Sequence, residues 1–423
     1  MDSEDFRSKE FPQLDTNLYF DFAGSMPASQ SQAKKYQKFV NEVLTNPHSS
    51  SQINRATNEI AQLRSLLLSQ MNTTPNDYFV VFTHNTTAAA QTLANLLKIS
   101  DAGFTFNYLY DNHNSILGLS SIFKSRCKTA QINCIQNIND ILCNSSKQNS
   151  LFAFPMVSNF NGTRYPLEWI QKVQDSNSLV LLDAASTTMC DLSQCSKPDF
   201  VILSLLKLFG SHGGALLIRC DRASLLNDPP PAGGNLAYSC SRIFQSNDEE
   251  NFKLLPILSR RFEGGTVAYT DLLLALEGLK VRKSFGTEAF INQHLSSLSN
   301  HFYTKMNSLV HSNGKKLVKF YQKTFDYPTF AFNLLKDGSG ATNPTDDELI
   351  INHHDILFAF SALNVNIRSG SQCNPGATFT NLNWTPEEVV ALGKRSNQNN
   401  KCVSSLCIVD GKPVSTLRVS FGY

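Results

Sequence analysis

One lysine in this chain lies in an apolar setting, where burying its ammonium group costs free energy and so calls for an explanation. Lys207 lies within DFVILSLLKLFGSHGGALLIR, between a run that is apolar on both faces, Phe200 to Leu206, and a second apolar run, Ala215 to Ile218. In one interpretation its ammonium reaches water from a strand end or pairs with a carboxylate. In the other, desolvation lowers its pKa until the amine can form a Schiff base with an aldehyde cofactor, which in α/β proteins usually means pyridoxal phosphate. A nearby carboxylate, a phosphate site and a stacking ring would decide between them.

A carboxylate of the required kind follows an earlier strand. The segment from Asn177 to Leu182 is typical of a buried strand, and Asp183 closes it in SLVLLDAAS. An aspartate at a strand end is often a loop cap, but ligands of parallel sheets bind at the carboxyl ends of the strands. We therefore expect Asp183 and Lys207 to point into the same crevice, where Asp183 would keep a pyridine nitrogen protonated.

The phosphate site and the ring are indicated further upstream. A strand from Tyr78 to Phe82 leads into an Ala- and Leu-rich helix that begins near Thr86. The helix start offers free backbone N–H groups and the hydroxyls of Thr86 and Thr87, although threonine is also an ordinary N-cap. His113 follows the next strand in FNYLYDNHNSILG. A histidine there is often structural, and its cofactor role depends on the groups around it.

Two residues near the C-terminus extend the candidate site. Cys373 lies in SGSQCNPGA, a polar segment with Gly and Pro that predicts a mobile, exposed loop. The alternative for Cys373 is a small buried hydrophobe. Arg418 lies in the alternating strand TLRVSFGY, where it either forms an ion pair or binds a substrate carboxylate through its bidentate fork.

A set of motifs in fixed order covers almost the whole chain: YFDFAGSMP, NPHSSS, VFTHNTTAAA, DNHNSILG, LFAFPMVSNFNGTRYPLEWI, LLDAAS, the Lys207 segment, FEGGTVAY, NIRSGSQCNPGA and LRVSFGY. This set resembles the class V aminotransferase group of fold-type I pyridoxal phosphate enzymes. Within that group it is most similar to the aminotransferase-like domain of the molybdenum cofactor sulfurases. SNFNGTRYPL, the lysine followed by LFG, and CNPGA favour that branch over the bacterial cysteine desulfurases.

The resemblance implies a role for each matched residue at the pyridoxal phosphate site. Thr87 and Ser204 match residues that bind the phosphate, and Asp183 matches the partner of the pyridine nitrogen. His113 matches the histidine stacked on the ring. Where the family usually has Ser-Gly-Ala-Thr at the helix start, this chain has His84-Asn85-Thr86-Thr87.

Three further matches concern the ring oxygen and a second subunit. Asn159 and Ser186 lie where the phenolic oxygen of the ring is held. Thr266, in EGGTVAY, matches a threonine that reaches the phosphate of the other subunit. The resemblance therefore implies a homodimer with shared sites.

The resemblance also implies a reaction. Arg418 would hold the carboxylate of L-cysteine, Lys207 would remove its α-proton, and His113 would move a proton at the substrate thiol. Cys373 would attack the substrate sulfur, which leaves a persulfide on Cys373 and alanine as product. The persulfide sulfur would then pass to the molybdenum cofactor of xanthine dehydrogenase and aldehyde oxidase.

Two other functions stay open at this point. A selenocysteine lyase or another class V β-lyase would keep Lys207 and Asp183 but would not need Cys373. A non-catalytic interaction protein would result if the altered cradle no longer bound the cofactor. A cofactor site needs several separate groups at the same time, and the presence of all of them in this sequence favours the sulfurase.

Composition excludes several other classes of protein. The formal net charge of +2 gives no reason to expect a nucleic-acid or membrane-surface partner. The N-terminal residues lack an apolar signal segment, and no apolar run approaches the roughly 18 residues of a membrane span, so we expect a cytoplasmic protein. The ten cysteines show no CxxC spacing, which favours reduced thiols and no metal site.

The expected fold class is α/β, with two domains. We expect a large, doubly wound, mostly parallel pyridoxal phosphate domain over residues 1–295, in which residues 1–30 pack on the smaller domain. The smaller α/β domain is expected over 296–423, with no C-terminal cofactor-binding domain of the MOSC type. Helices are expected over Ala28–Leu44, Tyr269–Val281 and Glu288–Leu309, and from a capping box at Thr385 to about Leu392.

Overall fold

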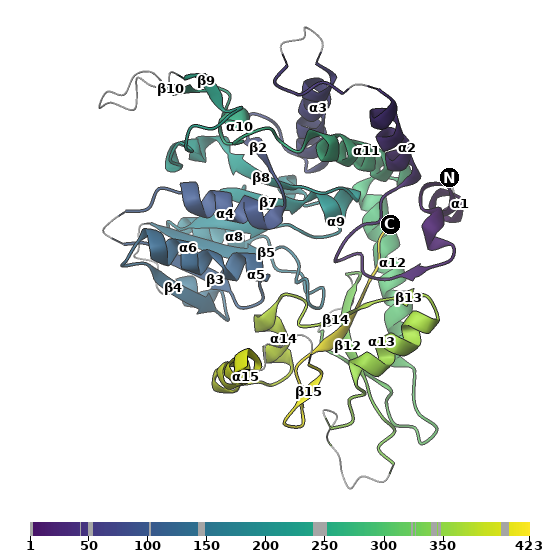
Figure 1. Cartoon of the computed structure of the whole chain (residues 1–423). Coiled ribbons are helices and arrows are strands. Elements are labelled where there is room, and N and C mark those ends of the chain that lie inside the picture. The colour runs from purple at the N-terminus through teal and green to yellow at the C-terminus, as the bar shows by residue number, and fades with distance from the viewer. Residues whose placement is uncertain are drawn as a thin grey trace.

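A seven-stranded sheet carries the larger lobe in the computed structural model (Figure 1). The structure describes residues 3–42, 44–49, 54–100, 103–142, 149–239, 252–322, 325, 327–339, 345, 348–398 and 406–423. Residues 50 and 51 of the NPHSSS motif lie outside them. In spatial order the strands are β2 (Tyr78–Thr83), β8 (Gly214–Arg219), β7 (Phe200–Ser204), β6 (Leu179–Asp183), β5 (Ser150–Pro155), β3 (Thr105–Leu109) and β4 (Gln131–Ile135).

The sheet is mostly parallel, as expected. β4, β3, β5, β6 and β7 pair in parallel, while β8 runs antiparallel to both β7 and β2. β2 therefore runs in the same direction as the five parallel strands. The carboxyl ends of six strands meet at one edge of the sheet, which is where ligands bind in such folds.

Alternate residues of the strands enter two separate cores. On one face they pack with helices α4 (Thr86–Leu96), α5 (Asn114–Leu117) and α6 (Leu119–Arg126). On the other face they pack with α3 (Arg55–Gln70), α8 (Trp169–Asp175), α9 (Leu205–Phe209) and α11 (Tyr269–Phe285). This explains why β6 and β7 read as continuous apolar runs, since both faces of these strands are buried.

The smaller lobe is built on a four-stranded antiparallel sheet, ordered β11 (Val318–Phe320), β12 (Thr329–Leu334), β17 (Thr416–Ser420) and β14 (Arg368–Gly370). Its helices are α13 (His353–Ala362), α14 (Pro375–Asn381) and α15 (Pro386–Gln398). A short hairpin joins β15 (Ile408–Val409) and β16 (Lys412–Pro413). The expected capping box is present, because Thr385 N donates to Glu388 Oε2 and Glu388 N donates to Thr385 Oγ1.

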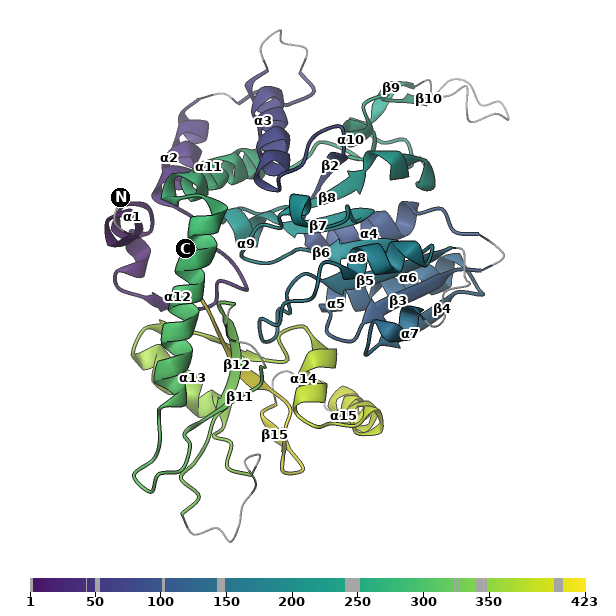
Figure 2. The same ribbon diagram turned by 180° about the vertical axis from the view of Figure 1, so that it is seen from behind.

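Two segments connect the lobes. Helix α12 (Glu288–Asn307) runs without a break from the larger lobe into the smaller one (Figures 1 and 2), and the expected boundary at residue 295 lies inside it. Near the N-terminus, β1 (Leu18–Tyr19) pairs in parallel with β13 (Val365–Asn366) of the smaller lobe. The domain limits stay a prediction, and so does the packing of residues 1–30 as a whole.

The remaining elements lie at the periphery. They are α1 (Ser3–Glu10), the 3-10 helix η1 (Pro12–Leu14), α2 (Gln30–Asn41), α7 (Asn139–Leu142), η2 (Leu192–Gln194), η3 (Cys220–Leu225), β9 (Leu236–Ser239), β10 (Phe252–Leu254) and α10 (Leu258–Arg261). α2 is shorter than the helix expected over Ala28–Leu44 and begins after a capping box between Ser29 and Gln32. No helix in the described part of the chain is long and apolar enough to cross a membrane.

Candidate active site

Lys207 lies on a short helix and not in a strand, which corrects one expectation. Leu205 and Leu206 belong to α9 with the lysine, because Ser204 ends β7 and caps the helix by accepting a hydrogen bond from Lys207 N at 3.3 Å. Gly210 ends α9 with φ of 67°, a left-handed conformation that suits glycine. The apolar run looked like one strand because the strand and the first turn of the helix are both buried.

The amine of Lys207 is held next to the end of β6. Its Nζ donates to Ala185 O at 3.1 Å. The pKa of Lys207 is lowered to about 8, chiefly by burial; the negative charges of Asp183 and Asp21 oppose the shift, and the positive charges of Arg418 and Arg368 add to it. A lysine of this kind is available as a neutral amine near physiological pH.

Asp183 ends β6 with its carboxylate buried. Its Oδ1 accepts a hydrogen bond from Ala185 N at 2.9 Å. Burial raises the pKa of Asp183, whereas that backbone N–H group and the charge of Lys207 act in the opposite direction. The structure thus brings Asp183 and Lys207 together beside Ala185, as expected.

His113 lies after β3, at the N-terminus of α5. Its Nδ1 accepts from Ser115 N at 3.1 Å and lies 2.9 Å from Ser115 Oγ. Burial lowers the pKa of His113 to about 4, and the positive charges of Lys207, Arg368 and Arg418 add to the effect. The imidazole is thus neutral at physiological pH, with its proton on Nε2.

The two threonines at the start of α4 differ in their environments. Thr86 Oγ1 donates to Leu203 O at 3.1 Å and so ties the helix start to β7. Thr87 is half-buried, and its hydroxyl has no hydrogen-bond partner among the described residues. The helix start lies close against β8, because a Cβ atom on Gly214 would lie 2.3 Å from the carbonyl carbon of Asn85.

Of the remaining expected cofactor residues, Ser186 makes a local hydrogen bond and Asn159 a long-range one. Ser186 Oγ donates to Thr188 O at 2.9 Å, within its own loop. Asn159 Nδ2 donates to Gln372 O at 2.7 Å, which joins the end of β5 to the cysteine loop.

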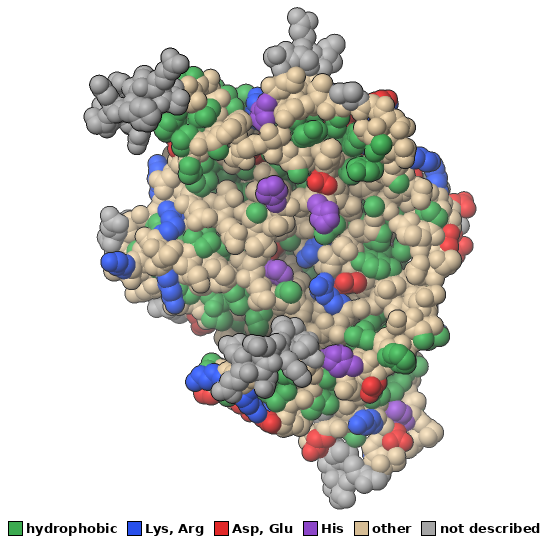
Figure 3. Space-filling view, viewed as in Figure 1, with side chains coloured by type: hydrophobic (Ala, Val, Ile, Leu, Met, Phe, Trp, Pro, Cys, Tyr) green, Lys and Arg blue, Asp and Glu red, His purple; other side chains and the backbone are tan. Residues whose placement is uncertain are grey.

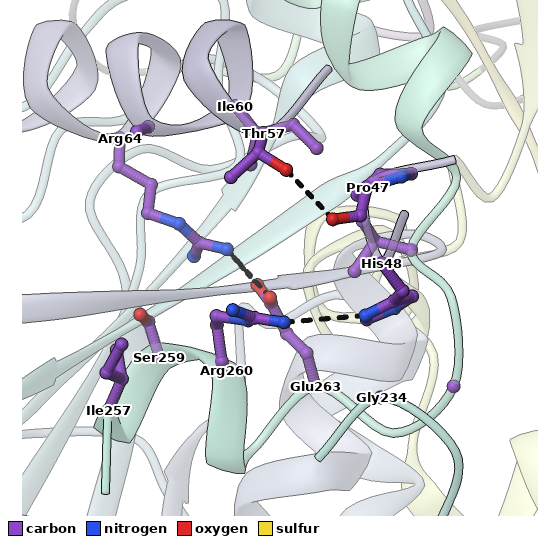
Figure 4. Close-up of a pocket in the computed structure, with 13 residues that line it drawn as sticks. Pro47, His48, Thr57, Ile60, Arg64, Gly234, Ile257, Ser259, Arg260 and Glu263 are labelled. Carbon is purple, nitrogen blue, oxygen red and sulfur yellow. Dashed lines mark hydrogen bonds and ion pairs between the residues drawn. The ribbon is translucent and has the colours of Figure 1, made fainter. Parts of the chain in front are cut away.

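Thr266 is exposed. It lines a cavity of about 270 Å³ with Thr83, His84 and Gly213, next to the start of α4. The loop before it is anchored by Glu263, which pairs with Arg64 of α3 at 2.7 Å and accepts from Phe82 N. Figure 4 shows this ion pair, which lines an adjacent cavity of about 210 Å³.

The smaller lobe brings Arg418 and Cys373 to the same place. Arg418, on β17, is only 2% exposed; its Nη1 donates to Asn159 O at 2.8 Å. Cys373 is exposed, as expected, and its carbonyl accepts from Asn114 N at 2.8 Å. On the face seen in Figure 3, histidine, basic and acidic side chains gather at the centre, over the junction of the lobes.

The mobility of the loop around Cys373 stays a prediction, but the loop makes contacts that its composition did not indicate. The loop residues are held by hydrogen bonds to the larger lobe, at Gln372 O, Cys373 O and the side chain of Asn374. Gly and Pro indicated irregular backbone, and that part was correct. What the composition could not indicate is that the partners of this backbone lie more than two hundred positions away.

Sequence reasoning missed two charged residues of the site. Asp21 Oδ1 lies 2.6 Å from Arg418 Nη2, and its Oδ2 lies 3.6 Å from Arg368 Nη1. Arg368 faces Arg418 directly across β14 and β17. Asp21 lies in YFDFAGSMP and Arg368 in NIRSGSQCNPGA, so both are within recognised motifs, but neither has a neighbour in sequence that signals its role.

No group of three or more His, Cys, Asp or Glu side chains that could hold a metal ion occurs within the described ranges. The polar groups at the strand ends instead suit an organic ligand with an anionic group, because they combine a helix N-terminus, a buried carboxylate and a lysine of lowered pKa. The six strand ends supply most of these groups, as the parallel sheet predicts.

Curated proteins of known sequence resemble the chain along nearly its whole length. Molybdenum cofactor sulfurase 3 of Aedes aegypti is 31% identical over 440 residues, covering 98% of this chain and 55% of the relative. The human molybdenum cofactor sulfurase is 30% identical over 461 residues, covering 99% and 49%. The chain thus spans about half the length of the curated relatives it matches.

Solved structures share the fold. A cysteine desulfurase from Thermococcus onnurineus NA1 superposes with a TM-score of 0.74 at 17% identity, covering 99% of this chain and 93% of its own. A cysteine desulfurase from Escherichia coli gives 0.71 at 16% identity, covering 100% and 94%. The expected fold-type I architecture is confirmed. Since the model of the aminotransferase class V family matches residues 18–423, the chain belongs to that family.

Proposed function

We propose that the chain is the cysteine desulfurase part of a molybdenum cofactor sulfurase, which uses pyridoxal phosphate to take sulfur from L-cysteine and release alanine. One observation carries the proposal: Lys207, Asp183 and His113 of the larger lobe converge with Cys373 and Arg418 of the smaller lobe. The likeness to curated sulfurases supports it.

The residues at the strand ends fit pyridoxal phosphate. The start of α4 presents backbone N–H groups beside Gly214, where the close approach leaves no room for a side chain. Thr87 and Ser204 would hold the phosphate, Asp183 the pyridine nitrogen and His113 the ring face. When bound, the cofactor supplies an electron sink that stabilises negative charge at the substrate Cα.

The chain's own groups would then bind the substrate and move its protons. Arg418 and Arg368 would bind the carboxylate of L-cysteine, because both guanidinium groups face the same region. Lys207, with its pKa of about 8, would accept the proton from the substrate Cα. His113, which is neutral and carries its proton on Nε2, would donate a hydrogen bond from that nitrogen to the substrate sulfur. Asn159 and Ser186 stay predictions for the phenolic oxygen of the cofactor.

Cys373 would receive the sulfur. Its thiolate attacks the substrate Sγ, an S–S bond forms, and the Cβ–Sγ bond breaks. The electron pair of that bond remains with Cβ, which takes up a proton and becomes the methyl group of alanine. The product on the protein is a Cys373 persulfide, so atoms and electrons balance without an external oxidant.

The acceptor, the subunit arrangement and the compartment belong to the proposal as well. The persulfide sulfur would pass to the molybdenum cofactor, as the names of the curated relatives suggest. The motif resemblance implies that it replaces an oxo ligand there, for xanthine dehydrogenase and aldehyde oxidase. Thr266 would reach the phosphate of a second copy, which makes the active form a homodimer. The compartment we propose is the cytoplasm.

A single-turnover experiment tests the proposal. Cofactor-loaded protein is mixed with L-cysteine, and alanine and protein-bound persulfide are quantified beside Cys373→Ala. Equal amounts of alanine and persulfide in the wild type, and neither in the variant, are the expected result. Alanine formation that ignores the substitution would favour a β-lyase, and no turnover with no retained cofactor would favour a non-catalytic interaction protein.

A further inference from the structure

The backbone at Cys373 is strained in a way that needs support. Gln372 and Cys373 both have φ of 55°, in the left-handed region that residues with side chains rarely adopt. Such conformations persist only where surrounding contacts hold them, and they often occur at functional sites. The contacts that hold this loop, between β14 and α14, therefore decide where the Cys373 thiol stands.

The larger lobe holds the carbonyl groups of both strained residues. Asn159 Nδ2 donates to Gln372 O at 2.7 Å, and Asn114 N donates to Cys373 O at 2.8 Å. Asn114 directly follows His113. The loop and the His113 segment are thus joined by a backbone hydrogen bond at the cysteine itself.

The side chain of Asn374 forms the central contact. It is fully buried, and its Oδ1 caps α14 by accepting from Ala377 N at 3.1 Å. Its Nδ2 donates to Asn159 Oδ1 at 2.9 Å and to Asp111 Oδ1 at 2.5 Å. The side-chain amide of Asn374, the residue next to Cys373, therefore links the start of α14 to the larger lobe.

Asp111 is a buried carboxylate that the reaction itself does not use. It is 2% exposed, and besides Asn374 it accepts from Ser158 Oγ and Tyr165 Oη, each at 2.7 Å. Burial raises the pKa of Asp111, and its three hydrogen-bond donors offset part of that effect. Asp111 also lies two positions before His113, so it holds the loop against the segment that carries the histidine.

The backbone packing at this contact is equally close. A Cβ atom on Gly376 would lie 1.9 Å from Tyr110 O, so α14 lies directly against the residue before Asp111. The segment from Tyr110 to Asn114 is thus the surface on which the cysteine loop docks.

We propose that Asp111 is a positioning residue, whose buried hydrogen bond to Asn374 docks the Cys373 loop on the His113 segment and so sets the position of the thiol that receives sulfur. The part of this inference that concerns sulfur transfer to Cys373 rests on the proposed function. The docking itself is a property of the chain without cofactor or substrate.

The exchange Asn374→Asp tests the contact with little change in size. Aspartate still caps α14, but an oxygen replaces the N–H donor and faces the carboxylate of Asp111. In single turnover we expect persulfide formation on Cys373 to slow by about tenfold to hundredfold, because small displacements of a reacting group have effects of that size. Retained pyridoxal phosphate and the spectral response to L-cysteine should stay within about twofold of wild type.

Two further variants make the test specific. Asp111→Asn combined with Asn374→Asp exchanges donor and acceptor and should recover a large part of the lost rate. Asn381→Asp makes the same chemical change at the other end of α14, where the amide donates only to Ala377 O of its own helix, and should behave as wild type. A wild-type persulfide rate in Asn374→Asp, or no recovery in the double variant, would overturn the proposal.

A second measurement separates this inference from the proposed function. In protein without cofactor, alkylation of Cys373 by iodoacetamide and backbone hydrogen exchange over 370–378 should both accelerate in Asn374→Asp. If neither the alkylation rate nor the hydrogen-exchange rate changes in the variant, the docking role is refuted, even if the wild type forms persulfide. A wild type that forms no persulfide, with both values accelerated in the variant, would refute the desulfurase and leave the docking role supported.

Discussion

Arg418 is joined to Asp21 by an ion pair of 2.6 Å between residues 397 positions apart. Arg368 lies opposite Arg418 in the sheet and 3.6 Å from the other oxygen of Asp21. Asp21 carries the same functional group that an amino-acid substrate would present to these arginines. A carboxylate of the protein therefore contacts the two arginines that we propose bind the substrate.

Replacing Asp21 by asparagine should favour substrate binding at the cost of stability. Without the competing charge, KM for L-cysteine should fall about threefold to tenfold, and the free energy of unfolding should fall by about 1–3 kcal/mol because buried Arg418 loses a charged partner. Steady-state kinetics and urea unfolding check both, with Asp15→Asn as an exposed control. A raised KM would mean that Asp21 orients Arg418 and does not compete with the substrate.

Incorporation of pyridoxal phosphate into the cofactor-free protein should depend on pH through Lys207. Because burial holds the pKa of Lys207 at about 8, the neutral amine becomes more abundant from pH 7 to pH 9. We expect the rate of covalent incorporation to rise over this range with a midpoint near 8, and to vanish in Lys207→Arg. Mass spectrometry after borohydride reduction measures it. A midpoint above 10 would contradict the lowered pKa.

The same residue should make stability depend on pH. The pKa of Lys207 is lower in the folded chain than its ordinary value of 10.5, so the unfolded chain binds more protons between about pH 8 and 10.5. The unfavourable contribution of the charged lysine is therefore complete below about pH 8 and disappears as the pH rises to about 10.5. The free energy of unfolding of wild type minus that of Lys207→Met should increase over this window. A constant difference would contradict it.

His113 should remain neutral over the whole range in which the protein is handled. With its pKa lowered to about 4, its imidazole should show neutral nitrogen chemical shifts from pH 5 to 8, with the proton on Nε2 because Nδ1 accepts from Ser115 N. Two-dimensional NMR of histidine-labelled protein, assigned with His113→Gln, measures this. A titration midpoint above 6 would be inconsistent with the buried environment.

Substitutions of the two neighbouring threonines should have different effects, one on stability and the other on cofactor binding. Thr86→Val removes the hydrogen bond to Leu203 O and should lower the free energy of unfolding by about 1 kcal/mol. Thr87→Val should leave stability nearly unchanged but weaken pyridoxal phosphate binding by about tenfold or more, because a hydrogen bond to a charged phosphate is lost. Urea unfolding and equilibrium dialysis of both variants provide the comparison. The reverse pattern would assign the phosphate to Thr86.

Gly214 should be intolerant of any side chain. A Cβ there would overlap the backbone of Asn85, which cannot yield without moving the start of α4. Gly214→Ala should cost about 1–3 kcal/mol and reduce cofactor retention. Gly233→Ala, whose Cβ would meet nothing within 4 Å, is the matched control and should change stability by less than about 0.5 kcal/mol. Equal stabilities would contradict the close approach.

The parts of the site that lie at the carboxyl edge of the parallel sheet could be predicted from the sequence. Asp183 ends a strand, His113 and the start of α4 each follow one, and parallel strands bring their carboxyl ends together. The helix that carries Lys207 was missed because an apolar run of this length does not distinguish a strand from a buried helical turn. Its boundary depends on one cap, Ser204, whose hydroxyl accepts from Lys207 N.

The contacts that complete the site were beyond sequence reasoning for another reason. Asp21 with Arg418, and Asp111 with Asn374, are pairs of ordinary polar residues 397 and 263 positions apart. No local pattern marks such pairs, since each residue alone is compatible with a solvated surface position. Only the assembled fold shows that Arg418, Asp111 and Asn374 are buried and need one another.

The pairing of β1 with β13, and of Asp21 with Ser420, has a consequence for protein synthesis. Residues 18–21 leave the ribosome early, but their partners on β13 and β17 follow only after some 20–80 s at about 5–20 residues per second. The strands of the larger lobe are complete long before then. We therefore expect the nascent chain to acquire the cofactor-binding edge first and the arginine pair later, so that a chain with only the larger lobe exposed can hold cofactor but cannot yet bind an amino acid.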